Sequence, residues 1–252
     1  MGTHDTSWGE VSSWYDDLLE GGSDTYQEKV ILPNLLRLLE PYRGKCVLDF
    51  ACGQGYFSRA LFKAGLRVIG VDVSEELIAI AKKHSGADIR YIVAPSDNVR
   101  VLAGGSVDAA LIVLALQNIE NTPGTLKECF RLVGSGGRLF IILNHPAFRI
   151  PKHSGWEFDE KEGRQYRRLD SYLSEDRQVI DMSPSGRKKV VTISFHRPLQ
   201  YYAKHLYNAG FLVARLEEWV SHKKSGAGPR AESENRARKE FPLFLMIEAV
   251  RI

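Results

Sequence analysis

The sequence predicts an α/β protein built on a doubly wound, mostly parallel sheet of seven strands. Between residues 45 and 143, short apolar runs alternate with segments of helical periodicity, and two more strand-like runs follow near the C-terminus. The run Val107–Leu114 is almost wholly apolar, which is typical of a strand covered on both faces. Strands that alternate with helices pair in parallel through right-handed crossovers, so helices cover both faces of such a sheet.

The N-terminal part and the core elements follow from hydrophobic periodicity. Trp14–Leu19 and Val30–Leu39 have helical spacing, with breaks expected at Gly21–Gly22 and Pro33. Ser74 is expected to cap the second core helix. The expected core elements are, in order, strand 45–50, helix 55–64, strand 67–73, helix 74–84, strand 89–93, strand 107–114, helix 122–133 and strand 137–143.

The pattern changes after residue 143. We expect an irregular segment at 144–163 and a mobile loop at 221–240, because the first is rich in breakers and the second in charge. The other elements expected are strands 165–173, 178–182 and 189–195, a turn at 183–188, helix 197–209, and final strands 211–220 and 243–252. The chain thus divides into an N-terminal helical lid (1–44), an α/β core (45–143), a β-rich insert after the fifth strand (144–196) and the C-terminal part of the core (197–252).

Composition excludes several classes of protein. The chain has 252 residues, 44% hydrophobic and 26% charged, which excludes a disordered or collagen-like chain. A net charge of +3 is too small to argue for nucleic acid. Three cysteines without a C-x-x-C pair argue against a disulfide framework or a zinc site and favour a reducing compartment. With no apolar run near 20 residues and no signal-like N-terminus, we expect a cytoplasmic protein without a membrane partner.

The sharpest motif is the run of residues 47–55, V-L-D-F-A-C-G-Q-G, which reads as strand, acid, glycine loop and helix start. Gly53 and Gly55 let the backbone approach a ligand. A dinucleotide-binding fingerprint is the alternative, but its third glycine position is Ser58 here. Asp49 at the strand end would also repel a pyrophosphate, whereas it suits a cationic ligand without phosphates.

Three further motifs follow in order, each at the end of an expected strand. Asp72 lies 19 residues after Gly53, where a carboxylate can accept both hydroxyls of a ribose. Asp97, just after the third strand, can accept a hydrogen bond from an adenine amine. The segment Leu114–Gln117 follows the fourth strand.

Together these motifs resemble the class I S-adenosylmethionine-dependent methyltransferases, in particular the small-molecule and quinone-type (ubiquinone/menaquinone methyltransferase-like) subgroup. The resemblance covers about 45–143 and implies a Rossmann-like sheet, S-adenosyl-L-methionine as cofactor and S-adenosyl-L-homocysteine as product. The residues that it implies for cofactor binding are Asp49, Ala51, Gly53, Gly55, Asp72, Val73, Ser96, Asp97, Asn98, Leu114 and Gln117.

The acceptor is less well defined by the sequence. Signatures of amino-methylating and cytosine-methylating enzymes are absent, as is a catechol-type magnesium site, so we expect a small organic acceptor and no metal. His145 and His196 are candidate catalytic bases, since a histidine can deprotonate a hydroxyl near neutral pH. The candidate substrate-binding residues are Trp14, Tyr15, Asn144, Arg149, Trp156, Tyr166, Arg168, Tyr172 and Tyr202.

Several alternatives stay open. Trp14 fits a lid or a core position, His145 fits a base or a turn histidine bonded to backbone, and the arginines fit an anionic substrate group or solvent. The insert could cover the acceptor or pair with a second copy in a homodimer. The function predicted is in-line methyl transfer to a small molecule. The competing functions are an RNA or protein methyltransferase, a non-catalytic cofactor-binding protein and, more distantly, a dinucleotide oxidoreductase.

Overall fold

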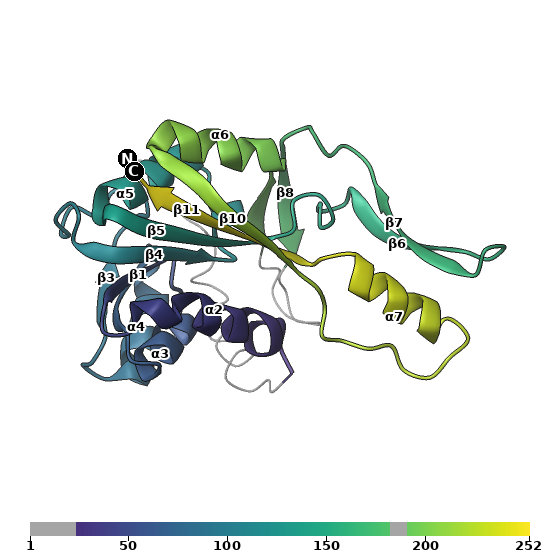
Figure 1. The fold of residues 1–252 in the computed structure, drawn as a ribbon, viewed down its shortest axis with the longest axis horizontal. Helices are drawn as coiled ribbons and strands as arrows, with labels where there is room; N and C mark the ends of the chain where they lie inside the picture. Colours follow the sequence, from purple (N-terminus) through teal and green to yellow (C-terminus); the bar gives the residue numbers. More distant parts are fainter. Residues whose placement is uncertain (1–23, 182–190) are drawn as a thin grey trace.

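The computed structural model describes residues 24–181 and 191–252, and its centre is one seven-stranded sheet (Figure 1). The strand order is β3-β2-β1-β4-β5-β11-β10, with β11 antiparallel to both its neighbours and the other contacts parallel. The strands are β1 (Cys46–Phe50), β2 (Arg67–Asp72), β3 (Arg90–Val93), β4 (Val107–Val113), β5 (Val133–Asn144), β10 (Phe211–Trp219) and β11 (Phe244–Arg251). The predicted doubly wound, mostly parallel sheet is confirmed.

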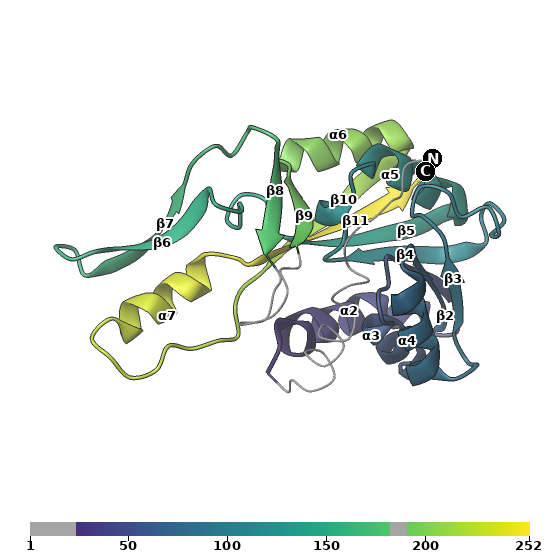
Figure 2. The same cartoon turned by 180° about the vertical axis from the view of Figure 1, so that it is seen from behind.

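Helices cover both faces of this sheet (Figures 1 and 2). One face carries α2 (Leu32–Leu39), α3 (Tyr56–Lys63) and α4 (Glu75–Ser85), and the other carries α5 (Thr122–Leu132) and α6 (Leu199–Ala209). A hydrophobic cluster fills the space on each face. The fully apolar middle of β4 serves both clusters, since Ala110 and Ile112 belong to one and Ala109 and Leu111 to the other.

The helical start of the chain continues through Pro33 without the predicted break. A π-helical turn, η2 (Gln27–Ile31), runs directly into α2, where Pro33 occupies the first turn. A proline is tolerated there because the first backbone N–H groups of a helix need no intrahelical partner. A short 3-10 turn, η3 (Glu40–Tyr42), then leads to β1. The expected helix at Trp14–Leu19 lies outside the described residues.

An arm built from two distant parts of the chain projects from the sheet (Figures 1 and 2). It joins the antiparallel hairpin β6 (Ser154–Asp159) and β7 (Arg164–Leu169) to helix α7 (Ala231–Glu240). The Gln165 amide donates to Ser233 Oγ at 2.7 Å, and the rings of Trp156 and Phe241 meet edge to face at 5.5 Å. The expected irregular segment 144–163 is thus interrupted by β6, and the loop expected at 221–240 is a loop only as far as residue 230, where α7 follows. The strand expected to reach Leu173 ends at Leu169.

A second hairpin, β8 (Asp176–Asp181) with β9 (Val191–His196), completes the segment between β5 and α6. It is separate from the β6–β7 hairpin, so this segment holds two small ribbons and not one sheet. The proposed boundaries of the lid, core, insert and C-terminal part stay predictions. No helix in the described ranges is long and apolar enough to cross a membrane.

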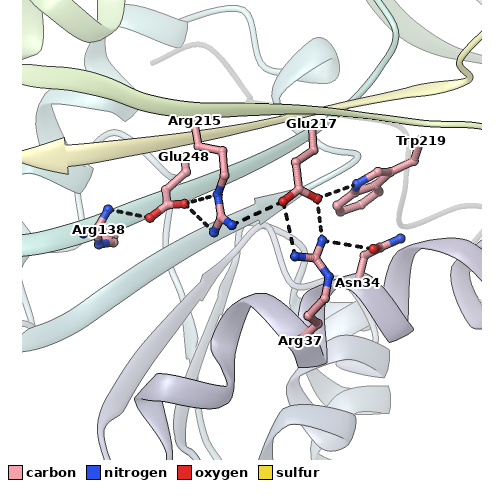
Figure 3. A network of polar contacts seen from close by, with 7 residues as sticks. All are labelled: Asn34, Arg37, Arg138, Arg215, Glu217, Trp219 and Glu248. Carbon is pink, nitrogen blue, oxygen red and sulfur yellow. Dashed lines mark hydrogen bonds and ion pairs between the residues drawn. The ribbon is translucent and has the colours of Figure 1, made fainter.

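A chain of ion pairs ties α2 to the edge of the sheet (Figure 3). Glu248 on β11 is 5% exposed and accepts hydrogen bonds from Arg138 at 2.5 Å and from Arg215 at 2.7 Å. Arg215 also lies 3.4 Å from Glu217, which accepts two hydrogen bonds from Arg37 of α2. These pairs tie α2 to β10 and, through Glu248, to β11 and β5.

Candidate functional site

A large cavity of about 630 Å³ lies at the carboxyl ends of β1, β2, β3 and β4. In a doubly wound sheet this edge is where ligands bind. Four carboxylates line the cavity, those of Asp49, Asp72, Asp97 and Glu120, and its described lining contains no lysine, arginine or histidine. The cavity therefore suits a ligand that carries positive charge.

The loop after β1 adopts a backbone that brings it close to this cavity. Ala51 and Gly53 have positive φ values of 52° and 56°, and both line the cavity. Gly55, at φ 79°, starts α3, and a Cβ there would lie 2.4 Å from the hydroxyl of Tyr91. Gly55 is thus needed for close packing against Tyr91. It does not line the cavity itself, whereas its neighbours Gln54 and Tyr56 do.

Asp72 holds the glycine loop and the start of α4 together. One carboxylate oxygen accepts a hydrogen bond from the Gly53 amide at 2.8 Å, and the other accepts one from the Ser74 amide at 2.9 Å. Ser74 caps α4, as predicted, by accepting from the Leu77 amide at 3.2 Å. Burial raises the pKa of Asp72. A carboxylate has about four acceptor positions, so beside its backbone partners Asp72 keeps at least one for a ribose hydroxyl.

Asp49 is the most deeply buried acid of the cavity, at 2% exposure. Its carboxylate accepts a hydrogen bond from Ser58 Oγ at 2.6 Å. Burial raises the pKa of Asp49 to about 7, and the nearby charge of Asp72 adds to this effect, while the Ser58 hydrogen bond opposes it. A cation placed beside Asp49 would favour its ionised form.

The far side of the cavity comes from the loops after β3 and β4. Ser96 and Asp97 line it, and Asp97 accepts a hydrogen bond from the Asn121 side chain at 2.7 Å. Asn98 is exposed and accepts instead from Arg100, so it lies outside the lining. Val73 at the end of β2 lines the cavity too.

Leu114, another of the lining residues, has φ 53°, a value unusual for a residue with a side chain. Such backbone strain gathers at functional sites.

Sequence reasoning missed the wall that β9 contributes. Ile193 and Phe195 line the cavity, and all its other described lining residues lie between Asp49 and Asn121 in the sequence. Their spacing of two residues predicts that both lie on one face of a strand. No sequence signal tells which element that face meets, because the contact depends on how the hairpin folds back over the sheet.

A second, small cavity of about 30 Å³ gathers several of the predicted residues. Gln117, at 9% exposure, borders this cavity and not the large one. Asn144, Arg149, His196 and Tyr202 border it as well, and Phe195 borders both cavities. The structure thus separates Gln117 from the other residues that we predicted to bind the cofactor and groups it with candidate acceptor residues.

The two candidate histidines are both engaged by other groups. His145 is 5% exposed, its Nε2 lies 2.8 Å from Glu218, and its Nδ1 accepts from the Ala147 amide at 3.2 Å. Burial lowers the pKa of His145, and Glu218 opposes this. His145 borders neither cavity, so its contacts match the alternative of a turn histidine. His196 Nε2 lies 2.8 Å from the Tyr172 carbonyl oxygen.

The aromatic and basic residues predicted to bind substrate in the hairpins lie away from both cavities. Trp156 packs in the arm under Arg167, Tyr166 donates a hydrogen bond to Glu157 at 2.8 Å, and Arg168 pairs with the same Glu157 at 2.7 Å.

Tyr172 contacts the small cavity only through a neighbour, since its hydroxyl accepts from the Leu199 amide at 3.1 Å and its carbonyl meets His196. Trp14 and Tyr15 lie outside the described residues.

The large cavity has the chemistry that S-adenosylmethionine requires. This molecule carries a positive sulfonium, a positive ammonium and one carboxylate, which matches a lining with four acids and no cationic side chain. Asp72 has acceptor positions for the ribose, and the volume lies within the roughly 300–1,000 Å³ of ligand pockets. The residues present therefore fit the cofactor.

Comparison with known proteins leads to the same class. Residues 48–141 match the family described as a methyltransferase domain. A crystal structure of an S-adenosylmethionine-dependent methyltransferase from Mesorhizobium loti is similar, with a TM-score of 0.70 and 26% identity over 92% of this chain and 100% of that one. The core of the chain, residues 48–141, is therefore a methyltransferase domain of the class I S-adenosylmethionine-dependent type, and the cofactor of such a domain is S-adenosylmethionine.

Among curated proteins, relatives of known activity match this chain over part of its length. The malonyl-[acyl-carrier protein] O-methyltransferase of Pectobacterium atrosepticum is 38% identical over 41% of this chain and 40% of its own length. The ubiquinone biosynthesis O-methyltransferase of Aromatoleum aromaticum is 32% identical over 42% of this chain and 47% of its own length. Each alignment spans less than half of the relative and less than half of this chain.

Proposed function

We propose that the protein transfers the methyl group of S-adenosylmethionine to a small organic acceptor. One observation carries this proposal. The cavity is lined not only by residues expected to hold the cofactor but also by Ile193 and Phe195 of β9. A wall contributed from outside the nucleotide-binding elements leaves a partly enclosed space for a second small molecule. The curated O-methyltransferase relatives support the same reaction class.

The chain's own residues would position both reactants. S-adenosylmethionine supplies a methyl group that is already activated by its bond to a positively charged sulfur. In the proposed complex, Asp72 orients the ribose and the Asp97 loop meets the adenine, while the buried Asp49 carboxylate stabilises positive charge. Ile193 and Phe195 exclude water from the acceptor. Positioning and water exclusion are the main contributions such a site has to make.

This proposal assigns no histidine as the general base, and the kind of acceptor decides whether a base is needed. His145 is held by Glu218 and by a turn amide, and no histidine lines the described part of the large cavity. An amine or an activated carbon needs little help from a base, whereas a hydroxyl would have to lose its proton to solvent or to a carboxylate of the cavity.

We extend the proposal to the setting of the protein. The three cysteines Cys46, Cys52 and Cys129 are all unpaired, which supports a reducing, cytoplasmic setting. We also propose that the insert allows a homodimer, and that neither nucleic acid nor a membrane is a partner.

The test is a calorimetric titration with S-adenosylhomocysteine, with NAD as the competing ligand. We expect micromolar-range binding of the first alone, and weaker binding in Asp72→Ala but not in the exposed control Asp88→Ala. Transfer of labelled methyl is then measured to phenols, amines, quinones and RNA. Methylation of RNA alone, or tight cofactor binding without any transfer, would replace the small-molecule proposal with one of its two alternatives.

A further inference from the structure

The small cavity of about 30 Å³ adjoins the large one at Phe195, the residue that borders both. A ligand that extends past Phe195 could therefore place one end in each space. The volume is about twice the roughly 10–15 Å³ that a single water requires, which leaves room for a group of two or three heavy atoms. The cavity is therefore a pocket for one end of a molecule.

Arg149 borders this pocket without a carboxylate partner among the described residues. Its Nη1 donates to the Asn144 side chain at 2.6 Å, and its guanidinium carbon lies 5.5 Å from the centre of the Phe244 ring. Among the described residues, the titratable groups that act on Arg149 are Tyr26 and Arg167, and neither is a carboxylate. Burial lowers the pKa of Arg149, as expected for a cation removed from water without an anion beside it.

The neighbouring Arg197 shows how many hydrogen-bond acceptors surround a buried arginine with a structural role in this protein. It is 5% exposed, and its guanidinium donates to Thr122 Oγ1 and to backbone carbonyls that include those of Ile119 and Glu120. Arg197 is thus fully used in holding a loop. Arg149 has one such acceptor and keeps most of its five N–H donors available.

Gln117 supplies a second, independent observation at the same pocket. Its amide nitrogen donates to the Leu114 carbonyl at 2.7 Å, which fixes the orientation of the amide. Its Oε1 is buried and has no hydrogen-bond partner, although the residue is only 9% exposed. A buried acceptor without a donor is costly, and such groups are rare in folded proteins.

We propose that this pocket is a subsite for a carboxylate of the methyl acceptor, bound by Arg149, with a hydroxyl or amine of the acceptor donating to Gln117 Oε1. The inference rests on the proposed function, because it assigns the far end of the molecule that would be methylated in the large cavity. A planar carboxylate matches the fork of a guanidinium and the size of the pocket. The Phe195 ring then packs against the apolar or aromatic part between the two ends.

The experiment compares two probes of equal shape, benzoate and benzamide, on the full chain saturated with S-adenosylhomocysteine. Saturation fills the cofactor site, so the probes report on the acceptor side only. We expect benzoate to bind at least about tenfold more tightly than benzamide, because only the carboxylate gains charge-assisted hydrogen bonds. This comparison uses the unaltered protein and does not depend on a variant that folds.

Two variants then assign the preference to a residue. Arg149→Met keeps the bulk of the side chain and removes its charge, and we expect it to abolish the preference for benzoate while leaving S-adenosylhomocysteine affinity unchanged. Arg43→Met makes the same charge change at an exposed position just before β1, at the opposite edge of the sheet, and should bind both probes as the unaltered protein does.

The outcomes separate this inference from the proposed function. Equal affinity for the two probes, no binding of either, or a full preference retained in Arg149→Met overturns the subsite while S-adenosylhomocysteine binding stands. Weakened S-adenosylhomocysteine binding in Arg149→Met overturns it too, since Arg149 would then serve the cofactor's own carboxylate. Failure of S-adenosylhomocysteine to bind the unaltered protein refutes the proposed function. If the protein then still prefers benzoate, and the preference still depends on Arg149, the pocket is an anion site without a role in methyl transfer.

Discussion

The buried carboxyl group of Asp49 predicts that cofactor affinity depends on pH. With a pKa raised to about 7 by burial, Asp49 is about half protonated at neutral pH in the ligand-free protein. If S-adenosylmethionine binds only the ionised form, its affinity follows the ionised fraction, which is about 0.9 at pH 8 and about 0.1 at pH 6. We therefore expect the dissociation constant to rise about tenfold between pH 8 and pH 6. S-adenosylhomocysteine, which lacks the sulfonium charge, should show a smaller rise.

Isothermal titration calorimetry at pH 6, 7 and 8 tests this prediction, with two buffers of different ionisation enthalpy to count the protons released. Asp49→Asn keeps the size of the side chain and an oxygen that can accept from Ser58, but it cannot ionise. The cofactor's own amine titrates alike with both proteins, so the difference between them reports on Asp49. An equal pH dependence in Asp49→Asn and in the unaltered protein would refute the reasoning; Asp88→Asn is the exposed control.

Three other predictions follow from the same contacts. Asp72→Ala should weaken S-adenosylhomocysteine binding by about 1–3 kcal/mol, measured by calorimetry, because it removes charge-assisted hydrogen bonds; an unchanged affinity would take Asp72 out of the site. Glu248→Ala should lower the free energy of unfolding in urea by about 1–3 kcal/mol, since it leaves Arg138 and Arg215 without their shared carboxylate, and an unchanged urea midpoint would show that the pairing contributes nothing. His145→Gln should lower the melting temperature without slowing methyl transfer at saturating acceptor, and a large fall in kcat at unchanged stability would instead make it a base.

The core of the fold was predictable because its signals are local. An almost fully apolar run such as Val107–Val113, set between helical patterns, favours a strand buried on both faces, and the cap at Ser74 needs no distant residue. The break expected at Pro33 failed because proline disrupts the interior of a helix and not its first turn. Position within the helix, which a composition pattern does not give, decided the outcome.

The arm could not be predicted because its stability is tertiary. Helix α7 buries only Ala237 among its ten residues, so it has almost no amphipathic signal of its own. Its hydrogen bond to the β7 backbone joins positions 68 residues apart. The acceptor side follows the same rule, since Phe195, Arg149 and Gln117 meet only once β9 folds over the end of the sheet.

The construction of the arm has a consequence for the order in which the chain folds. Its hairpin and its helix leave the sheet beside one paired position, where Asn144 at the end of β5 lies opposite Phe244 at the start of β11. A loop of about a hundred residues must close before that pair forms, and closing long loops is slow. The arm should therefore be among the last parts to acquire its native contacts. For the same reason it should be among the first parts to lose them when the protein opens locally. In native-state hydrogen exchange, we expect the amides of α7 to lose protection at far lower denaturant concentrations than those of β4.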